Sequence, residues 1–576
     1  MSADESAETL NERANALSRA GQLKEAAALY RLAIAAEPSL AKAHGNLATS
    51  LRAQGKWAEA EQSYRTAIEL GSARATTGLC TLLLTQGRAD EVLEALERLP
   101  KEDSAGIFAK LGEVPLAANQ ALRIGAAWLR MREVDARADV GVARAVETMT
   151  FGPSLSIVVP RTLGLITPFV LKEQGDWFED ELPFVRRVLQ SGEAAVDIGA
   201  NFGVFTLSLA KAVGETGRVV AYEPASATHR FLESSIRANG FEHVVAVRAA
   251  VSDHDGEATF TNASSPELSG LDVSADEPGS WTETVPIETL DTVEPRVAGR
   301  RVSFVKIDAE GEEVRILEGG RGFLSRHEPL LMTELRHAGQ VNGTLLAKLR
   351  ELGLTVYRLV PGVGVLEPLS AEHEAEPFLL NVFACSKRAA TELAARGLLG
   401  DAAHTKPPPS PAPRVSIRGG DIVIEEARAA AELLARAATA DSADERLSNL
   451  YAARELAERA LEKRASIGTK CLFIRTLSEL GLRALANTVA RRTLGELDAR
   501  LEDLVVAPTA AYDAAFNDGP SRETVELALL DYLLRRDSWS GIFHPGLVDY
   551  ARRILQLDPA HARAATLVRL SKEAPG

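Results

Sequence analysis

The spacing of hydrophobic positions changes twice along this chain of 576 residues. Near the N-terminus and again from about Glu425 to Leu570, apolar residues recur every three or four positions, as in Leu447–Leu461 and Val525–Leu534, which predicts amphipathic helices. From about Pro153 onwards, short apolar runs alternate with helical patterns, which predicts a parallel β-sheet covered by helices. The sequence therefore predicts a multidomain protein with an α/β domain between two helical regions.

Changes of composition give the expected boundaries of these regions. Within the linker before the C-terminal helices, residues 406–413 read Lys-Pro-Pro-Pro-Ser-Pro-Ala-Pro, and such proline-rich segments are stiff and extended. We expect a helical domain at 1–116, a helical bridge at 117–152, an α/β domain at 153–390, a linker at 391–424 and a C-terminal helical domain at 425–576.

An internal repeat occupies the first 75 residues. Small and aromatic residues recur with an offset of 34 positions: Gly21, Ala26, Tyr30 and Ala33 correspond to Gly55, Ala60, Tyr64 and Ala67. Small residues let two helices pack closely, and a glycine ends the first helix of each pair. The pattern resembles tetratricopeptide (TPR) repeats, with a degenerate third repeat expected from Leu82 onwards; a plain helical hairpin bundle is the alternative.

The α/β domain contains seven candidate strands. They are Ala194–Ile198, Arg218–Tyr222, Val244–Arg248, Ser303–Ile307, Leu330–Glu334, Thr355–Val360 and Phe378–Ala384. The last two are joined without a convincing helix, so we expect them to form an antiparallel pair at the sheet edge. The polar stretch Glu257–Leu290 is expected to form a short β excursion or a loop over the edge that carries the site.

The first candidate strand leads into a glycine-containing turn. It ends in Asp197, and Gly199, Asn201 and Gly203 follow before a helix, as in the first turn of a nucleotide-binding sheet. The glycines let the backbone approach a ligand, and the strand-end carboxylate can face an ammonium such as that of S-adenosylmethionine (SAM). Glu223 stands twenty residues beyond Gly203, at the tip of the second candidate strand, where it can accept ribose hydroxyls.

A dinucleotide site is the rival interpretation of this turn, because it uses the same acidic residue for ribose. The turn lacks the Gly-x-Gly-x-x-Gly pattern through which a backbone approaches pyrophosphate. Asp197 would repel that phosphate, and the antiparallel pair does not belong to a dinucleotide-binding sheet. These features favour SAM.

The fourth candidate strand carries the candidate catalytic groups. Lys306, Asp308 and Glu310 alternate along its C-terminal end, so their side chains share one face and point into the expected cleft. A base near a hydroxyl nucleophile helps methyl transfer from a sulfonium. Asp308 is the first choice for this base or for orienting the acceptor, Glu310 and Lys306 are next, and Glu334 is more distant.

A structural interpretation of the same residues is also open. Lys306 and Asp308 can form an ion pair, while the glutamates that follow begin a helix whose N-terminus favours acids. Two carboxylates also suit Mg²⁺, but they are common without a metal, and we assign none.

Six sequence blocks from Ser156 to Arg388 resemble the FkbM-type SAM-dependent methyltransferases. The blocks are DWFEDE at Asp176–Glu181, VDIGANFGVFTL, VVAYEPA, AAVSDHDGEATF, VPIETLDTV and FVKIDAEGEEVRILEGG at Phe304–Gly320. The resemblance implies a class I methyltransferase fold, Rossmann-like, with a seven-stranded sheet whose last strand is antiparallel. It also implies O-methylation of a hydroxyl on a sugar or secondary metabolite.

The resemblance extends the set of residues expected to bind the cofactor. Trp177 and Glu179 resemble the family's segment that covers SAM, and Ala250–Ser252 stand where class I methyltransferases contact adenine. The expected SAM-binding residues are Glu179, Asp197, Gly199, Ala200, Asn201, Gly203, Thr206, Glu223, Ala250, Val251 and Ser252.

The composition of the chain excludes some classes of binding partner and indicates the cellular compartment. The formal net charge of −15 and the isoelectric point near 5.4 argue against binding nucleic acid through the whole molecule. Three distant cysteines favour neither disulfides nor a zinc site, which indicates a reducing compartment. With no secretory segment and no long apolar run, we expect a cytoplasmic protein without a transmembrane segment.

The sequence thus predicts a SAM-dependent O-methyltransferase that acts on a sugar, glycan or small molecule. Its helical repeats are expected to bind a partner protein or the acceptor. The alternative is a TPR scaffold whose methyltransferase-like domain binds SAM without catalysis, and a methyl-transfer assay separates the two.

Overall fold

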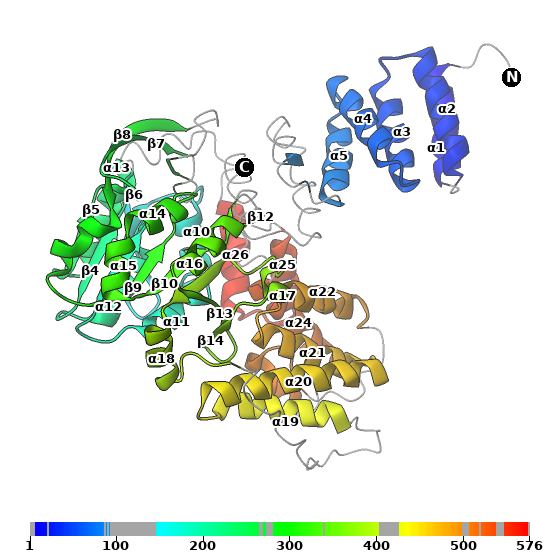
Figure 1. Ribbon diagram of the computed structural model, residues 1–576. Helices are drawn as coiled ribbons and strands as arrows, with labels where there is room; N and C mark the ends of the chain where they lie inside the picture. Colours follow the sequence, from blue (N-terminus) through cyan, green and yellow to red (C-terminus); the bar gives the residue numbers. More distant parts are fainter. Residues whose placement is uncertain are drawn as a thin grey trace. The chain divides into compact units, whose positions relative to one another are not determined.

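The computed structural model describes residues 6–19, 22–85, 88, 91–92, 146–263, 266, 269–271, 280–337, 340–401, 425–497, 506–517, 520–536 and 546–573. Helices α1 to α5 belong to one compact unit, and the elements from β1 to α26 belong to a second (Figure 1). In the described part of the chain, no helix combines the length and the apolar character needed to cross a bilayer.

The first unit is a series of helical hairpins. Its helices are α1 (Ala7–Arg19), α2 (Leu23–Ala36), α3 (Ala41–Ala53), α4 (Trp57–Glu69) and α5 (Ala73–Thr85). The repeated residues are buried at equivalent places: Ala26, Tyr30 and Ala33 in α2, and Ala60, Tyr64 and Ala67 in α4. A Cβ atom at Gly78 would lie 2.3 Å from the Tyr64 ring, so α5 approaches that tyrosine closely. The predicted TPR packing is confirmed for the first two repeats.

The segment between the units differs from its prediction where it is described. The second helix of the degenerate third repeat and residues 117–145 of the predicted helical bridge lie outside the described residues, apart from residues 88 and 91–92. Val146–Phe151, placed at the end of that bridge, forms strand β1, which pairs antiparallel with β2 (Leu155–Pro160). The predicted helix is wrong there, because β1 alternates exposed and partly buried residues before the buried Phe151.

The α/β domain is built on one mixed sheet with the strand order β14-β13-β15-β10-β9-β3-β4-β5. The strands are β3 (Ala194–Ile198), β4 (Arg218–Tyr222), β5 (Val244–Val247), β9 (Val302–Ile307), β10 (Leu330–Glu334), β13 (Thr355–Val360), β14 (Val365–Pro368) and β15 (Asn381–Cys385). The chain runs outwards from β3 to β5 and then returns to β9 on the other side of β3. This reversal opens a ligand site at the carboxyl ends of β3, β4 and β9.

The seven predicted strands are present, and the sheet adds an eighth. β15 runs antiparallel to both β10 and β13, as expected for the last strand. It lies between them rather than at the edge, which is formed by β14 pairing antiparallel with β13. The edge placement of the β13–β15 pair is therefore corrected.

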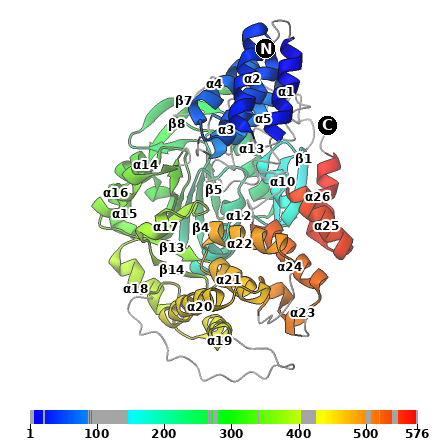
Figure 2. The same cartoon turned by 90° about the vertical axis from the view of Figure 1, so that its right-hand side faces the viewer.

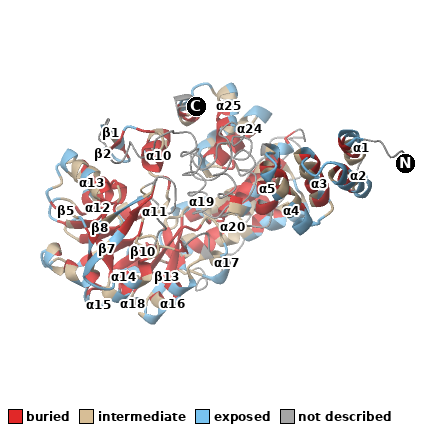
Figure 3. Cartoon of the chain, turned by 90° about the horizontal axis from the view of Figure 1, so that it is seen from above, coloured by how far each residue is buried: buried red, intermediate tan, exposed pale blue. Residues whose placement is uncertain are grey.

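Helices cover both faces of the sheet and bury its strands, which Figure 3 shows in red. Successive residues of β9 enter opposite cores: Phe304 packs with α11 and α12, and Val305 packs with α14 to α16. The covering helices are α10 (Ile166–Gln174), α11 (Glu181–Val188), α12 (Val204–Val213), α13 (Ser226–Ala238), α14 (Glu313–Gly319), α15 (Arg321–His327) and α16 (Gly343–Glu351).

The polar insertion between β5 and β9 forms a small sheet of its own. β6 (Ala250–Ser252), β7 (Gly256–Asn262) and β8 (Trp281–Thr289) have the order β6-β8-β7, and the 3₁₀ helix η2 (Leu290–Val297) follows. The β excursion predicted for Glu257–Leu290 is confirmed. The short elements β11 (Arg336–His337), β12 (Gln340–Val341), α17 (Ala371–Glu374) and α18 (Lys387–Ala395) complete this domain.

The C-terminal helices cover the edge of the main sheet (Figure 2). They are α19 (Glu425–Thr439), α20 (Ala443–Lys463), α21 (Ile467–Glu479), α22 (Arg483–Gly495), α23 (Asp513–Asn517), α24 (Arg522–Arg536), α25 (Leu547–Leu557) and α26 (Ala562–Glu573), with the 3₁₀ turn η4 (Ala510–Tyr512). Val360 of β13 and Val365 beside it share one core with α19 to α24. The backbone of Leu366 in the edge strand β14 is paired by residues 398–400, whose Leu398 carbonyl and Gly400 amide contact it.

The predicted linker is only partly described. Its first residues are packed rather than extended, because the Leu366 amide donates to the Leu398 carbonyl and the Asp401 amide donates to Asp444. Residues 402–424, with the proline-rich run, lie outside the described residues.

A buried ion pair fixes the sheet edge to these helices. The Arg358 side chain contacts Glu367 at 2.5 Å and donates to the Leu480 carbonyl at 2.6 Å, while Tyr451 donates to Glu367 at 2.7 Å. Both members of the pair are at most 5% exposed. A carboxylate left alone in such a place is strongly unfavourable.

We expect Arg358→Ala to lower the free energy of unfolding of this unit by about 3–5 kcal/mol, because Glu367 would remain buried without its counterion. Chemical denaturation of the full chain measures the change. Arg350→Ala is the control, since Arg350 is exposed in its pair with Glu374 and should cost less than about 1 kcal/mol. Equal effects of the two variants would contradict the role of Arg358.

Candidate active site

A cavity of about 960 Å³ lies at the carboxyl ends of β3, β4 and β9. Four segments expected from the sequence contribute to its wall: the turn Ile198–Phe202, Glu223–Pro224, Ala249–Val251 and Lys306–Glu310. Trp177 and Glu179 are also part of the wall. The structure therefore brings the predicted cofactor and catalytic segments to one place.

The turn after β3 touches the end of β9 through its backbone. A Cβ atom at Gly199 would lie 1.8 Å from the Asp308 carbonyl oxygen, so a larger residue there would force the two segments apart. Gly199, Asn201 and Gly203 all have positive φ angles, which glycine adopts readily and asparagine tolerates. The amides of Gly199 and Ala200 donate to the Tyr222 carbonyl, which anchors the turn to β4.

Asp197 lies beneath this turn rather than on the cavity wall. Its side chain is fully buried, accepts a hydrogen bond from Thr206 at 2.5 Å and has Lys306 Nζ at 3.7 Å. Burial raises its pKa, and Lys306 and Thr206 oppose that shift. The structure thus places Asp197 behind the cavity wall, and its contact with a ligand ammonium stays a prediction.

Three further residues that were predicted to bind SAM also lie behind the cavity wall. Gly203 begins α12, and a Cβ atom there would meet Leu232 at 2.8 Å. Thr206 donates to Asp197, and Ser252 donates to Glu312 at 2.6 Å. These residues shape the site from within the core, whereas Gly199, Ala200, Asn201, Ala250 and Val251 reach the cavity.

Glu223 presents its carboxylate at the end of β4. Its two oxygens accept the amides of Asn201 at 2.8 Å and Ala225 at 2.9 Å, which fixes the side chain on the cavity wall. Burial raises its pKa to about 7. A carboxylate held in this way keeps free lone pairs for two hydroxyl donors.

Lys306 is the central cation of the site. Its ammonium donates to Asp308 at 2.9 Å and to the Gly199 carbonyl at 3.3 Å, and it lies 5.2 Å from the centroid of the Phe205 ring. Burial acts to lower its pKa, but the carboxylates of Asp308 and Asp197 raise it above the ordinary lysine value. The raised pKa favours the protonated form of Lys306 near neutral pH, which suits a charge-balancing group better than a base.

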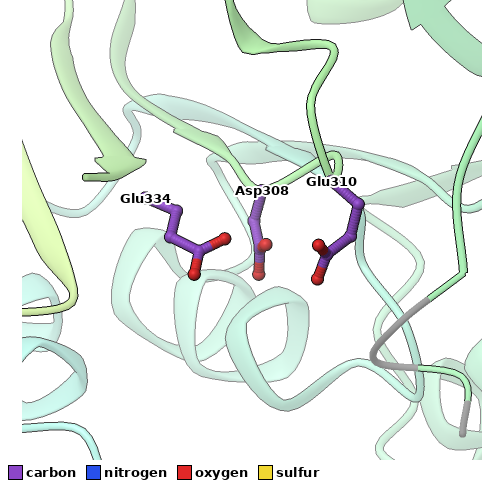
Figure 4. A group of neighbouring side chains, drawn as sticks. All are labelled: Asp308, Glu310 and Glu334. Atoms are coloured by element: carbon purple, nitrogen blue, oxygen red, sulfur yellow. The ribbon is translucent and has the colours of Figure 1, made fainter. Parts of the chain in front are cut away.

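A third carboxylate, that of Glu334 in β10, lies beside Asp308 and Glu310. One carboxylate oxygen from each of the three lies within 4.8 Å of the others, and Figure 4 shows the side chains converging. Burial and then the charges of Glu310 and Asp308 raise the pKa of Glu334 well above the ordinary value. Three carboxylates placed in this way could ligate a divalent cation. From the sequence we assigned no metal and expected Glu334 to lie farther away.

The wall also contains residues that sequence reasoning missed. Thr167 comes from α10, Phe205 from α12, and Phe260 and Leu271 from the insertion. Their residue types are ordinary core types, so no local signal distinguishes them. Glu179, which was predicted, accepts a hydrogen bond from Asn381 at 3.1 Å, and burial with the charge of Asp308 raises its pKa to about 7.

Comparison with known families agrees with this geometry. Residues 197–355 match the family "Methyltransferase FkbM domain". The chain contains an FkbM methyltransferase domain. The match begins at Asp197 and spans the Glu223 and Asp308 segments, and residues 11–75 and 51–106 match tetratricopeptide repeat families. No curated protein matches the chain.

Several solved structures are similar to parts of the chain. A methyltransferase FkbM from Methylobacillus flagellatus is 17% identical, with 36% of this chain and 50% of that chain covered at a TM-score of 0.23. A SAM-dependent O-methyltransferase from Thermotoga maritima is 16% identical, with 42% and 77% covered at a TM-score of 0.22. The P58(IPK) TPR domain is 10% identical, with 98% and 97% covered at a TM-score of 0.18. The chain thus spans half the length of the first of these structures.

The raised pKa of Glu223 predicts a pH-dependent stability of the FkbM domain. Between its ordinary value of 4.5 and about 7, the folded state holds a proton that the unfolded state releases. This group therefore makes the protein less stable as the pH rises through that window, by up to about 3 kcal/mol. We expect Glu223→Gln to reduce the loss of stability between pH 5 and pH 7.

Denaturant unfolding of both proteins at pH 5, 6 and 7 measures this difference. Glu257→Gln, at an exposed position of β7, is the control and should follow the wild-type curve. Parallel curves for the wild type and Glu223→Gln would show that the carboxyl is not protonated in the folded state.

Proposed function

We propose that the FkbM domain binds SAM in this cavity and transfers its methyl group to a hydroxyl of a sugar, glycan or other small molecule. The observation that carries the proposal is the pairing of a fixed Glu223 carboxylate with the close turn Gly199–Asn201 on one cavity wall.

The residues present fit SAM part by part. Glu223 would accept the ribose hydroxyls, Ala250 and Val251 would contact the adenine, and the backbone at Gly199 and Ala200 would contact the methionine part. Bound SAM supplies an electrophilic methyl group on its sulfonium. Asp197 and Thr206 would support this arrangement from beneath the turn.

Asp308 is our choice for the residue that receives the proton of the acceptor hydroxyl. Its side chain is 43% exposed, so an acceptor in the cavity can reach it, while Lys306 fixes its orientation through one oxygen. Glu310 lies within the same group of carboxylates and is the second choice. Lys306 would orient and balance charge rather than move a proton.

The TPR helices would bind a partner protein or the acceptor carrier, as helical repeats commonly do. Cys80, Cys385 and Cys471 are all free and buried, and we place the reaction in the reducing cytoplasm.

Calorimetry of the full chain with SAM tests the cofactor assignment. We expect Glu223→Ala to weaken SAM binding about 100-fold, because two hydrogen bonds to the ribose hydroxyls would be lost. Glu257→Ala should bind as the wild type does. Absence of SAM binding by the folded wild-type protein would refute the proposal.

Asp308→Asn tests the catalytic assignment. We expect methyl transfer from labelled SAM to a small-molecule and glycan extract to fall about 100-fold or more, since the amide cannot accept the proton. SAM affinity should stay within about threefold, and Asp549→Asn, at an exposed position of α25 away from the cavity wall, should have no effect. Wild-type SAM binding without transfer to any fraction would instead favour the scaffold alternative.

A further inference from the structure

We propose that the C-terminal helices hold one wall of the active site in place, and that Arg536 of α24 is a positioning residue for that wall. This inference rests on the proposed function. The wall segment is Trp177–Glu181, which joins α10 to α11. Trp177 and Glu179 from this segment line the SAM cavity.

The wall segment has a cavity on each side. The lining of a second cavity, of about 580 Å³, includes Asp180, Glu181, Arg358, Arg483 and Arg536. Glu179 faces the first cavity and Asp180 faces the second. Within this segment Phe178 is buried beside the Trp177 ring, whereas Glu179 and Asp180 are positioned by polar contacts.

Arg536 supplies such a contact from the last residue of α24. Its Nη1 atom donates to both carboxylate oxygens of Asp180, at 2.9 Å and 2.7 Å. Burial pushes the pKa of Asp180 upwards, but Arg536 and Arg483 hold it below the ordinary value, so this carboxylate is charged at neutral pH. Asp180 directly follows Glu179, so a movement of Asp180 moves the cavity wall.

A second ion pair joins α26 to α10, the helix that precedes the wall segment. Arg563 contacts Glu173 of α10 at 3.0 Å, and the Glu173 side chain is fully buried. Helices α10 and α26 lie side by side (Figures 1 and 2). Thr167, at the start of α10, also lines the cavity.

The helices that carry these arginines are themselves fixed to the sheet. α21 is tied to β13 through the Arg358 hydrogen bond to Leu480, and α24 packs on α22 within the shared core. The C-terminal helices therefore connect the sheet edge, through α21, with the cavity wall, through α24 and α26. Positioning by these helices lowers the cost of ordering the wall when a ligand binds.

Charge reversal of the Asp180–Arg536 pair in the full chain tests the proposal. This pair is about one third exposed, so its substitution is less disruptive than that of the buried Glu173 pair. We expect Arg536→Asp and Asp180→Arg each to weaken SAM binding about tenfold. Amide hydrogen exchange in residues 176–181 should become about tenfold faster in the ligand-free proteins.

The double variant, with both charges exchanged, should restore affinity and exchange to within about threefold of the wild type. Arg553→Ala is the matched control, because Arg553 pairs with Glu526 within the C-terminal helices and is exposed. Asp180→Asn, which removes the charge without reversing it, provides the same readouts if a reversed variant does not fold.

Unchanged exchange in 176–181 and unchanged SAM affinity in the single variants would overturn the proposal. So would faster exchange throughout the domain without rescue by the double variant, because that result indicates a general structural role. If the wild type does not bind SAM, the proposed function fails, whereas exchange in the ligand-free variants still tests the positioning of the wall.

Discussion

The active site depends on the buried ammonium of Lys306. It joins the end of β9 to the turn after β3, because it contacts Asp308, Asp197 and the Gly199 carbonyl together. A buried lysine stays charged only where counterions surround it, and the buried Asp197 needs the same partner. The same two segments approach closely at Gly199 and Asp308, because β3 and β9 are paired up to Ile198 and Ile307 and the Asp308 amide donates to the Ile198 carbonyl.

The local features of this site could be predicted from sequence because each has a short-range signature. The glycine turn, Glu223 and the Lys306–Asp308 alternation are all defined by spacing along one or two strands. The strands with apolar runs were found for the same reason. β14 was missed because its four residues are too few to show a hydrophobic periodicity. β1 was missed because Phe151 is its only buried residue.

Features that depend on packing between distant segments could not be predicted. The burial of Asp197 is set by Thr206 on the next helix and by Lys306 more than a hundred residues later. Glu334 lies near Asp308 and Glu310 because β10 lies beside β9. The residues around Glu334 in the sequence predicted only that it ends a strand. The burial of Val360 and Val365 at the sheet edge likewise depends on helices near the C-terminus of the chain.

The charge balance of the cavity constrains what can react there. The carboxylates of Asp308 and Glu310 lie close together, and the charge of Lys306 is shared between Asp308 and Asp197. Burial and these neighbouring charges raise the pKa values of Glu179 and Glu334. An anionic acceptor such as a phosphate would meet this excess of negative charge without compensation. A neutral hydroxyl meets no such penalty, and the carboxylates can accept its hydrogen bond. The cationic sulfonium of SAM is favoured by the same field, so the acidic cavity suits both the proposed cofactor and an uncharged acceptor.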